Sequence, residues 1–551
     1  MKKKIMNTKY IWLLIILLGF TACNTIEDVD KIDPVAEIPA LTSGTADFSK
    51  YVSVGASFTA GYTDGALFKA SQENSFPNIL SQKFALVGGG TFTQPLTSDN
   101  YGGLAAGGSR LPGFNPRLVF GGAGPVSLES LVGPVTVGTD IVLNNPTGPF
   151  NNMGVPGAKS YHLLFDGYGN IANLATKTAN PYFVRMASSP SATMLGDAMA
   201  KNPTFFTLSE IGGNDVLGYA LAGGDITIDQ ITPSATFDFA FETIVNTLTS
   251  GGAKGVVTNV PYVKDLPHFT TVPFAPLSPA NPSFGPLIPT LNGVFGQLNQ
   301  VYAYLQSVSA INNAAERSIV FSTSAASAVV IKDETLTDIS AQIAGVLVAS
   351  PTFPAFVQSF GLPVQAAPLV ANLLGGFYGQ TRQATTEDLL VLSSSSIIGT
   401  VNTTTYSYLL NQGLPANLAG QFSVEGVTNP LADKWVLLPS EQDEIKAATD
   451  TYNATISSVA SSKGLALVDL NGILTEATTS GYQTGNFILT TKLVTGGLIG
   501  LDGVHLTSRG YALMANEFLK AIDATYGSNF EASGNFANAG DYPTNYSPLL
   551  P

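Results

Sequence analysis

Cysteine, histidine and tryptophan are scarce in this chain of 551 residues, which has 1 Cys, 3 His and 2 Trp. The single cysteine, Cys23, has no second thiol with which to form an intramolecular disulfide. One thiol and three scattered histidines do not have zinc-ligand spacing, so no metal site is predicted. The chain also lacks a Walker A sequence and a dinucleotide fingerprint in strand–helix context, so no cofactor is predicted.

Charge is scarce too, and it is mostly of one sign. Only 12% of the residues are charged, and the formal net charge is -14. This balance argues against nucleic-acid binding, which normally requires a basic surface. Residues 339–381 contain no charged side chain at all. Several prolines interrupt this apolar stretch, so it does not predict a single transmembrane helix.

The hydrophobic content is 45%, which is ample for a large core. The N-terminus has a basic start and an apolar run, Ile11 to Phe20, that is too short to cross a bilayer comfortably. Residues 1–22 are therefore predicted to be a secretory signal peptide. The sole cysteine follows directly, and the segment resembles the lipobox of a bacterial lipoprotein, with Phe20 where leucine is usual.

That resemblance implies that Cys23 carries lipid and anchors the protein to a membrane. Residues 23–45 are then an acidic tether. Asn24 is not aspartate, so the resemblance implies the outer membrane, and the acidic run loosely resembles surface-export signals of Bacteroidetes-type lipoproteins. The alternative is a secreted protein with a free thiol.

Apolar runs rich in β-branched residues alternate with helical patterns along the chain, which predicts a doubly wound, mostly parallel α/β sheet in three layers. The predicted strands are Tyr51–Val54, Thr204–Leu208, Gly255–Val260 and Leu465–Asp469. The predicted helices are Ala66–Phe84, with an interruption at Phe76-Pro77 because proline fits best in a first turn, and Ala158–Phe165, Phe237–Leu248, Glu441–Ser462 and Ser508–Ala524. Residues 87–150 are predicted to be a Gly- and Pro-rich loop excursion with small strands.

This sheet domain is predicted to be discontinuous, formed by residues 46–265 and 440–530, with a C-terminal tail at 531–551. Residues 266–439 are predicted to be a large, mainly helical insertion. Two interpretations of the insertion remain open. It is either a small helical subdomain around its own core, or a cap over an active site that holds an acyl chain or dips into a membrane surface.

Ser57 is the candidate nucleophile. It follows a predicted strand in the sequence Gly55-Ala56-Ser57-Phe58. A serine in a small-residue turn after a strand can present its hydroxyl at the carboxyl edge of a sheet, where open α/β sheets bind ligands. The alternative is an ordinary turn serine or helix N-cap.

A serine hydroxyl needs a base, and histidine is the usual one. His162 falls inside a predicted helix and His268 follows a proline where the insertion begins, so both favour structural or rim roles. His505 lies three residues after Asp502, just before a helix-start signal. His505 is therefore the candidate base, with a turn and helix cap as the alternative interpretation of the Asp502–His505 segment.

Four segments in order carry a family resemblance: Gly55–Phe58, Gly154–Ala158, Gly212–Asp215 and Asp502–His505. Together they resemble the SGNH (GDSL-type) hydrolases. The resemblance covers about half of the chain and implies an SGNH-hydrolase or flavodoxin-like sheet and a serine esterase.

By the same resemblance, Ser57 is the nucleophile, His505 the base and Asp502 the residue that orients it. The implied oxyanion hole consists of the main-chain N–H of Ser57, the N–H of Gly157 and the side-chain amide of Asn214. Gly154 is the rival to Gly157, and a plain turn is the alternative for Asn214.

One departure from the family pattern concerns the nucleophile turn. The usual Gly-Asp-Ser-Leu is Gly55-Ala56-Ser57-Phe58 here. The missing acid is not a triad member, so the departure leaves only the local hydrogen bonding of the turn in question. Asp64 is a candidate substitute for it.

The predicted function is an esterase or lipase that cleaves an ester substrate, either a lipid or an acylated glycan, through an acyl-enzyme. One alternative is a carbohydrate O-acetylesterase or an acyltransferase that uses the same site. Another is a non-catalytic surface lipoprotein on a hydrolase fold.

Overall fold

The central sheet has five parallel strands. The computed structural model describes residues 38–550, so the predicted signal peptide, Cys23 and the tether up to residue 37 lie outside the described residues. The strands are β1 (Tyr51–Gly55), β6 (Asn152–Gly154), β7 (Phe205–Ser209), β8 (Lys254–Thr258) and β13 (Ala466–Val468), in the order β13-β8-β7-β1-β6. The predicted parallel α/β sheet is confirmed.

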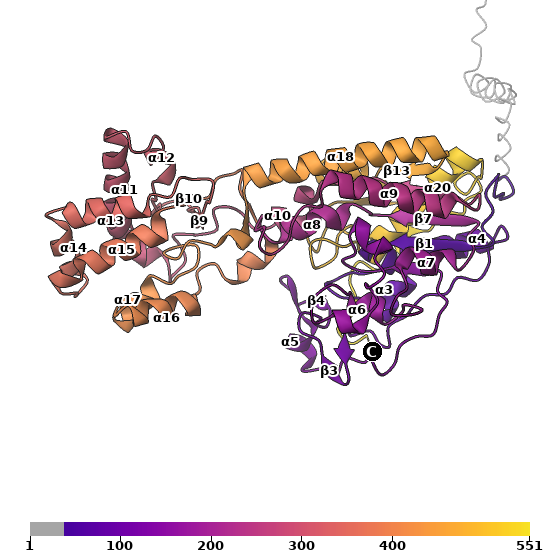
Figure 1. Ribbon diagram of the computed structural model, residues 1–551, viewed down its shortest axis with the longest axis horizontal. Helices are drawn as coiled ribbons and strands as arrows, with labels where there is room; N and C mark the ends of the chain where they lie inside the picture. The colour runs from indigo at the N-terminus through magenta and orange to yellow at the C-terminus, as the bar shows by residue number, and fades with distance from the viewer. Residues whose placement is uncertain (1–37, 551) are drawn as a thin grey trace, which may run out of the picture.

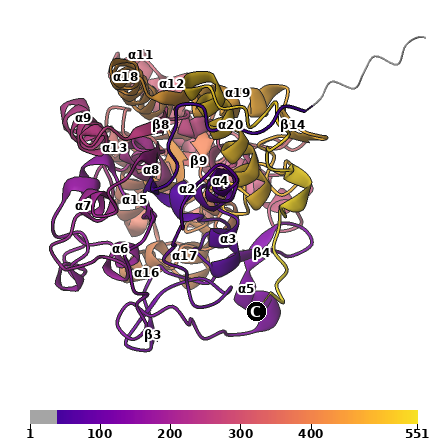
Figure 2. The same cartoon turned by 90° about the vertical axis from the view of Figure 1, so that its right-hand side faces the viewer.

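Helices cover both faces of this sheet. Every residue of β1 and β7 is buried, as expected when a parallel strand is covered on both sides. Helices α4 (Phe76–Ala85) and α20 (Ser508–Tyr526) pack together on one face, and α9 (Ser234–Thr249) packs against α18 (Pro439–Lys463) on the other (Figure 2). The predicted helices at the two ends of the chain therefore lie beside each other.

Strand β1 is the point where the winding direction of the sheet changes. In chain order the five strands are arranged 2-1-3-4-5, so β1 lies between β6 and β7. Gly55 is in register with Gly154 on one side and with Ser209 on the other. The three segments that follow these strands therefore leave the sheet at the same edge, where doubly wound sheets bind ligands.

A second lobe is formed by the chain between β8 and α18 (Figure 1). Its buried residues form a hydrophobic cluster separate from that of the sheet lobe. The principal elements are α11 (Ile288–Ser307), α13 (Ser340–Ala349), α14 (Phe353–Ser359), α15 (Ala367–Tyr378), α16 (Thr403–Asn411), α17 (Ala416–Gln421) and the antiparallel pair β9 (Val330–Lys332) and β10 (Thr381–Gln383).

The charge-free stretch forms α13 to α15, at the end of this lobe that points away from the sheet (Figure 1). Within residues 38–550, no single helix is long and apolar enough to cross a membrane. Helices α13 and α14 meet that criterion only as a pair, and they are bent by 94° at their junction.

Residues 87–150 and the C-terminal segment pack against each other. The excursion contains β2 (Ala105–Ala106), β3 (Ser109–Arg110), β4 (Leu118–Phe120), β5 (Pro125–Ser127) and α5 (Leu128–Val132). The guanidinium of Arg117 is fully buried and donates to the carbonyl oxygens of Asn100, at 2.8 Å, and Ser547, at 2.6 Å. These bonds fix the C-terminal segment against the excursion.

The shorter elements complete the two lobes. They are α2 (Ser57–Ala60), α3 (Lys69–Glu73), α6 (Pro181–Val184), α7 (Met194–Met199), α8 (Gly213–Leu221), α10 (Pro267–Thr270), α12 (Ala314–Arg317), α19 (Leu470–Thr479), β11 (Leu389–Leu390), β12 (Val436–Leu437), β14 (Tyr482–Thr484) and β15 (Phe487–Leu489).

One helix prediction needs correction. The helix predicted over Ala158–Phe165 is a short 3-10 helix, η2 (Ser160–Leu164). The interruption predicted at Phe76-Pro77 is confirmed: the stretch Ala66–Phe84 divides into α3 and α4, and Pro77 lies in the first turn of α4, where its missing N–H costs nothing.

Gly154 is a close-packing position at the edge of the sheet. A Cβ atom there would lie 2.3 Å from the nitrogen of Ala60 and 2.6 Å from the carbonyl carbon of Thr59. We expect Gly154→Ala to lower the free energy of unfolding by about 1–3 kcal/mol or more, because the main chain of α2 must move. Urea unfolding followed by circular dichroism measures this. Gly251→Ala is the control, since a Cβ there meets nothing within 4 Å, and an equal loss in both variants would contradict the prediction.

Candidate active site

Ser57 is the first residue of α2, immediately after the turn that ends β1. Its side chain is largely buried, with an exposed fraction of 6% for the residue. Its hydroxyl makes no hydrogen bond to any other residue within 38–550. The N–H groups of a first helical turn have no intrahelical acceptor, so that of Ser57 is available to a ligand.

Glu210 anchors the turn that carries Ser57. Its Oε1 accepts hydrogen bonds from the N–H of Ala56 at 2.7 Å and of Thr59 at 3.0 Å, and its Oε2 accepts from the Thr59 hydroxyl at 3.2 Å. Burial raises the pKa of Glu210 to about 7, against the effect of these hydrogen bonds. The residue has a φ of 50°, an uncommon value for a residue with a side chain. Glu210 therefore supplies the carboxyl group that accepts the hydrogen bonds of this turn, which Ala56 cannot do because it has no polar side chain.

Asp64, the substitute suggested by the sequence, has a different position, so that expectation is wrong. Its Oδ1 accepts a hydrogen bond from the N–H of Leu501 at 2.8 Å, not from the Ser57 turn. Burial, with a smaller contribution from the charge of Asp502, raises the pKa of Asp64 to about 7. Asp64 thus holds the loop that precedes Asp502.

Asp502 and His505 form a hydrogen-bonded pair. The Nδ1 of His505 lies 2.9 Å from Oδ2 of Asp502, and Oδ1 accepts from the N–H groups of Val504 and His505, both at 2.9 Å. Gly65 N–H also donates to Oδ2, at 2.8 Å. Burial opposes ionisation of Asp502, but the charge and hydrogen bonds of His505 outweigh it and lower the pKa of Asp502 to about 2. The carboxylate is therefore ionised at neutral pH and fixes the imidazole.

The imidazole of His505 lies against the helix of the candidate nucleophile. Its ring centroid is 6.0 Å from that of Phe58, the residue after Ser57, and 4.5 Å from that of Tyr62. The N–H of Tyr62 donates to the carbonyl oxygen of Ser57 at 2.9 Å. The structure thus brings the Asp502–His505 pair to the Ser57 turn, and Nε2 of His505 makes no hydrogen bond within the described part of the chain.

The two other predicted oxyanion-hole residues lie beside each other. The Nδ2 of Asn214, at the start of α8, donates to the carbonyl oxygen of Ala158 at 2.9 Å. Gly157, which precedes Ala158 in the chain, is exposed and has a φ of 81°, a value that favours glycine. The rival, Gly154, is buried and donates its N–H to Asn152 Oδ1 at 2.9 Å. Its amide is therefore occupied, and Gly157 is the better candidate.

Asp215 holds the second and third motif segments together. Its two carboxylate oxygens accept from the N–H of Ser160 at 2.9 Å and from the Ser160 hydroxyl at 2.7 Å. This contact joins the start of η2 to α8, on the same side of the sheet edge as Gly157 and Asn214.

The remaining histidines have packing roles. His162 stacks on Tyr168, with 4.3 Å between ring centroids, and burial lowers its pKa to about 4. His268 borders the candidate site, since its main-chain N–H donates to the carbonyl oxygen of Gly503 at 3.0 Å. Burial lowers the pKa of His268, which keeps the ring neutral at physiological pH.

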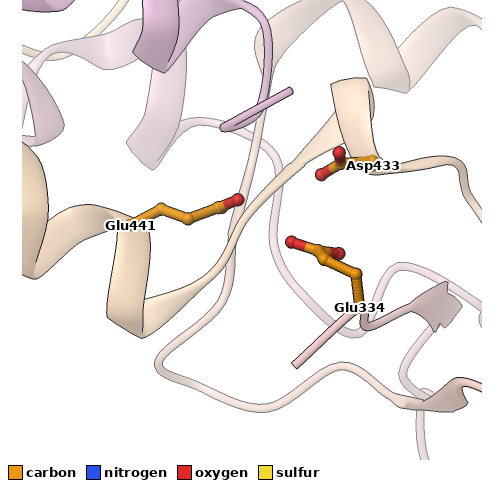
Figure 3. A group of neighbouring side chains, drawn as sticks. All are labelled: Glu334, Asp433 and Glu441. Atoms are coloured by element: carbon orange, nitrogen blue, oxygen red, sulfur yellow. The ribbon is translucent and has the colours of Figure 1, made fainter. Parts of the chain in front are cut away.

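Three carboxyl groups meet where the two lobes join: Glu334, Asp433 and Glu441 (Figure 3). Their nearest oxygens all lie within 4.8 Å of one another, so they could supply ligands to a hard divalent cation. Burial raises the pKa of Glu441 to about 9 and that of Asp433 to about 7. The three residues come from separate segments of the chain, so no local sequence pattern predicts this cluster.

Comparison of the chain with protein-family models, with curated proteins and with solved structures gave no match.

Glu210 is expected to make stability depend on pH. Its folded-state pKa of about 7 lies above its ordinary value of 4.5, so the folded protein holds this proton more tightly than the unfolded chain. The stabilisation is fully present below about pH 4.5 and is lost as pH rises through 7. We expect Glu210→Gln, which keeps an acceptor for the two N–H groups, to lose less stability than wild type between these pH values. The difference should be a few kcal/mol at most, since one pKa unit corresponds to about 1.4 kcal/mol.

Urea unfolding at a series of pH values measures this difference. Glu242→Gln, an exposed position on α9, is the control and should follow wild type. Parallel stability curves for wild type and Glu210→Gln would contradict the prediction.

Proposed function

We propose that this protein is a serine ester hydrolase of the SGNH type, an esterase or lipase. The observation that carries the proposal is the Asp502–His505 pair, which lies against the helix that begins at Ser57. This arrangement has the three parts of a nucleophile–base–orienter system. It lies at the carboxyl edge of the sheet, at the point where the strand order reverses.

In the first half of the reaction, the hydroxyl proton of Ser57 passes to Nε2 of His505 while Oγ attacks the ester carbonyl carbon. The resulting oxyanion accepts hydrogen bonds from the N–H groups of Ser57 and Gly157 and from the amide of Asn214. The bond from carbon to the alcohol oxygen then breaks, and the leaving alcohol takes the proton from His505. Asp502 stabilises the imidazolium throughout.

In the second half, a water molecule attacks the acyl-enzyme and gives its proton to His505. The bond between the acyl carbon and Oγ breaks, the carboxylic acid leaves, and Ser57 recovers its proton. Glu210 takes no part in proton transfer. It positions Ser57 by binding the main-chain amides of Ala56 and Thr59.

We further propose that the protein is anchored to the outer membrane by lipid on Cys23. The support is the basic start, the short apolar run and the sole cysteine that follows it. Mass spectrometry of the protein isolated from its membrane tests this proposal. We expect a chain that begins at Cys23 and carries lipid there, and an unmodified Cys23 or a chain that retains residues 1–22 would refute it.

The proposed nucleophile is tested with a fluorophosphonate probe, which reacts with activated serines. We expect labelling of wild type, and loss of labelling in Ser57→Ala and in His505→Ala, because a hydroxyl at its ordinary pKa is a poor nucleophile. Gel fluorescence measures the adduct, and peptide mapping locates it. Ser191→Ala, at an exposed serine, is the control. Labelling that persists in Ser57→Ala, with a folded protein, would refute the assignment.

The role of Asn214 is tested by Asn214→Asp, which keeps the size of the side chain and removes the amide donor. We expect kcat to fall by roughly 10²–10³ with little change in KM, because the donor acts on the oxyanion of the transition state. Steady-state kinetics on a soluble ester measure both parameters. Asn246→Asp, an exposed change on α9, should leave both unchanged. A rise in KM alone would assign Asn214 to ground-state binding instead.

A further inference from the structure

A large cavity lies between the sheet lobe and the second lobe. Its volume is about 1280 Å³, which exceeds the roughly 300–1,000 Å³ typical of sites for drug-sized molecules. The second lobe contributes walls from α11, α17 and the 3-10 helix η7 (Leu392–Ser396), and the sheet lobe contributes the β4–β5 hairpin and residues 493–495. The cavity thus requires both lobes.

The lining of this cavity has no charged group and no histidine. Its larger side chains are apolar, among them Leu291, Val294 and Phe422, and its polar ones are neutral. Two apolar side chains that border it are partly open to solvent, Phe120 with an exposed fraction of 41% and Leu287 with 45%. An ion or a charged headgroup would find no oppositely charged side chain in this lining, whereas a hydrocarbon chain would gain by leaving water for its apolar part.

Two of its walls reach the loop that carries the Asp502–His505 pair. On one side, Leu392 lines the cavity, and its Cδ2 is only 3.2 Å from the position that a Cβ on Gly503 would take. On the other, the N–H of Leu118, at the start of the β4–β5 hairpin, donates to the carbonyl oxygen of Asp64 at 2.7 Å. Asp64 in turn binds the N–H of Leu501. The cavity therefore borders the Asp502 loop, whereas none of the proposed catalytic and oxyanion-hole residues lines it.

We propose that this cavity holds the long acyl chain of the ester substrate, so that the protein prefers long-chain acyl esters over acetyl esters. The inference rests on the proposed esterase function for its chemistry, but the cavity is formed by the two lobes whether or not the protein cleaves esters. A chain whose carbonyl carbon lies at Ser57 would pass the Asp502 loop and enter the cavity beside Leu392. The second lobe is then a substrate-binding lobe, with α11 and α17 as its acyl-facing helices.

The preference is measured as kcat/KM of the full-length protein on acetyl, octanoyl and hexadecanoyl p-nitrophenyl esters below their aggregation concentrations. We expect kcat/KM to rise by about fourfold for each further buried methylene group, because each contributes about 0.8 kcal/mol. Equal rates on the three esters, or a preference for acetyl, would overturn the proposal.

A variant that obstructs the cavity isolates its contribution. Thr290, an exposed residue on α11, lines the cavity, so Thr290→Trp should block it without disturbing the core. We expect this variant to lose at least tenfold on the hexadecanoyl ester and to keep wild-type rates on the acetyl ester. Gln300→Trp, on the same helix but outside the lining, is the matched control and should behave as wild type.

Binding to the Ser57→Ala protein separates the cavity from catalysis. A fluorescent derivative of hexadecanoic acid should bind saturably, and Thr290→Trp in the same background should weaken binding at least tenfold. If no ester is cleaved but this binding is observed, the acyl site stands and the esterase function fails. If esters are cleaved but binding is absent or insensitive to Thr290→Trp, the acyl site fails and the esterase function stands.

Discussion

The parallel register of β1 with its two neighbours is the constraint on which the candidate site depends. Gly55 is aligned with Gly154 and with Ser209, so the segments that follow three strands begin at one level of the sheet. Ser57 lies two residues past that level and Glu210 one residue past it. A shift of one residue between β1 and β7 would turn the side chains of one strand to the opposite face relative to the other and would separate Glu210 from the Ser57 turn.

Three acidic side chains connect the segments at the carboxyl edge of the sheet, in a chain with few charges. Glu210, Asp64 and Asp502 each accept hydrogen bonds from main-chain N–H groups of a segment remote in sequence. A main-chain amide is a weak partner in water, but inside a protein it can satisfy a carboxylate without bringing in a second charge. Hydrogen-bond acceptors thereby fix the candidate site, whereas the hydroxyl of Ser57 and Nε2 of His505 make no hydrogen bond within residues 38–550. The departure at Ala56 is understandable in these terms, since the acid comes from the neighbouring strand instead.

Local pattern was sufficient to predict the strands β1, β7 and β8, which are continuous apolar runs, and the helices α9, α18 and α20. The scarcity of histidine and the position of His505 made it the candidate base, whereas the role of Asp502 was implied by the family resemblance. The helix α11 in the second lobe was not predicted. Strand β6 was missed because Asn152-Met153-Gly154 has no strand propensity, and its conformation comes from pairing with β1. Glu210 was missed as a positioning residue because its partners are remote, although an acid directly after a buried strand is a usable signal. The inter-lobe cavity and the carboxyl cluster of Glu334, Asp433 and Glu441 are products of tertiary assembly, and no local pattern could have predicted them.

The strands of the central sheet emerge from the ribosome at widely separated times. Strand β13 and helix α20 follow the entire second lobe in the chain, yet β13 pairs with β8, which precedes that lobe. A ribosome therefore releases the Ser57 turn early, whereas the Asp502–His505 pair and the last layer of the sheet emerge almost at the end. The second lobe, with its separate core, can condense in the interval. The nascent chain thus carries an unfinished sheet edge at β8, and any serine reactivity appears only once translation is nearly complete.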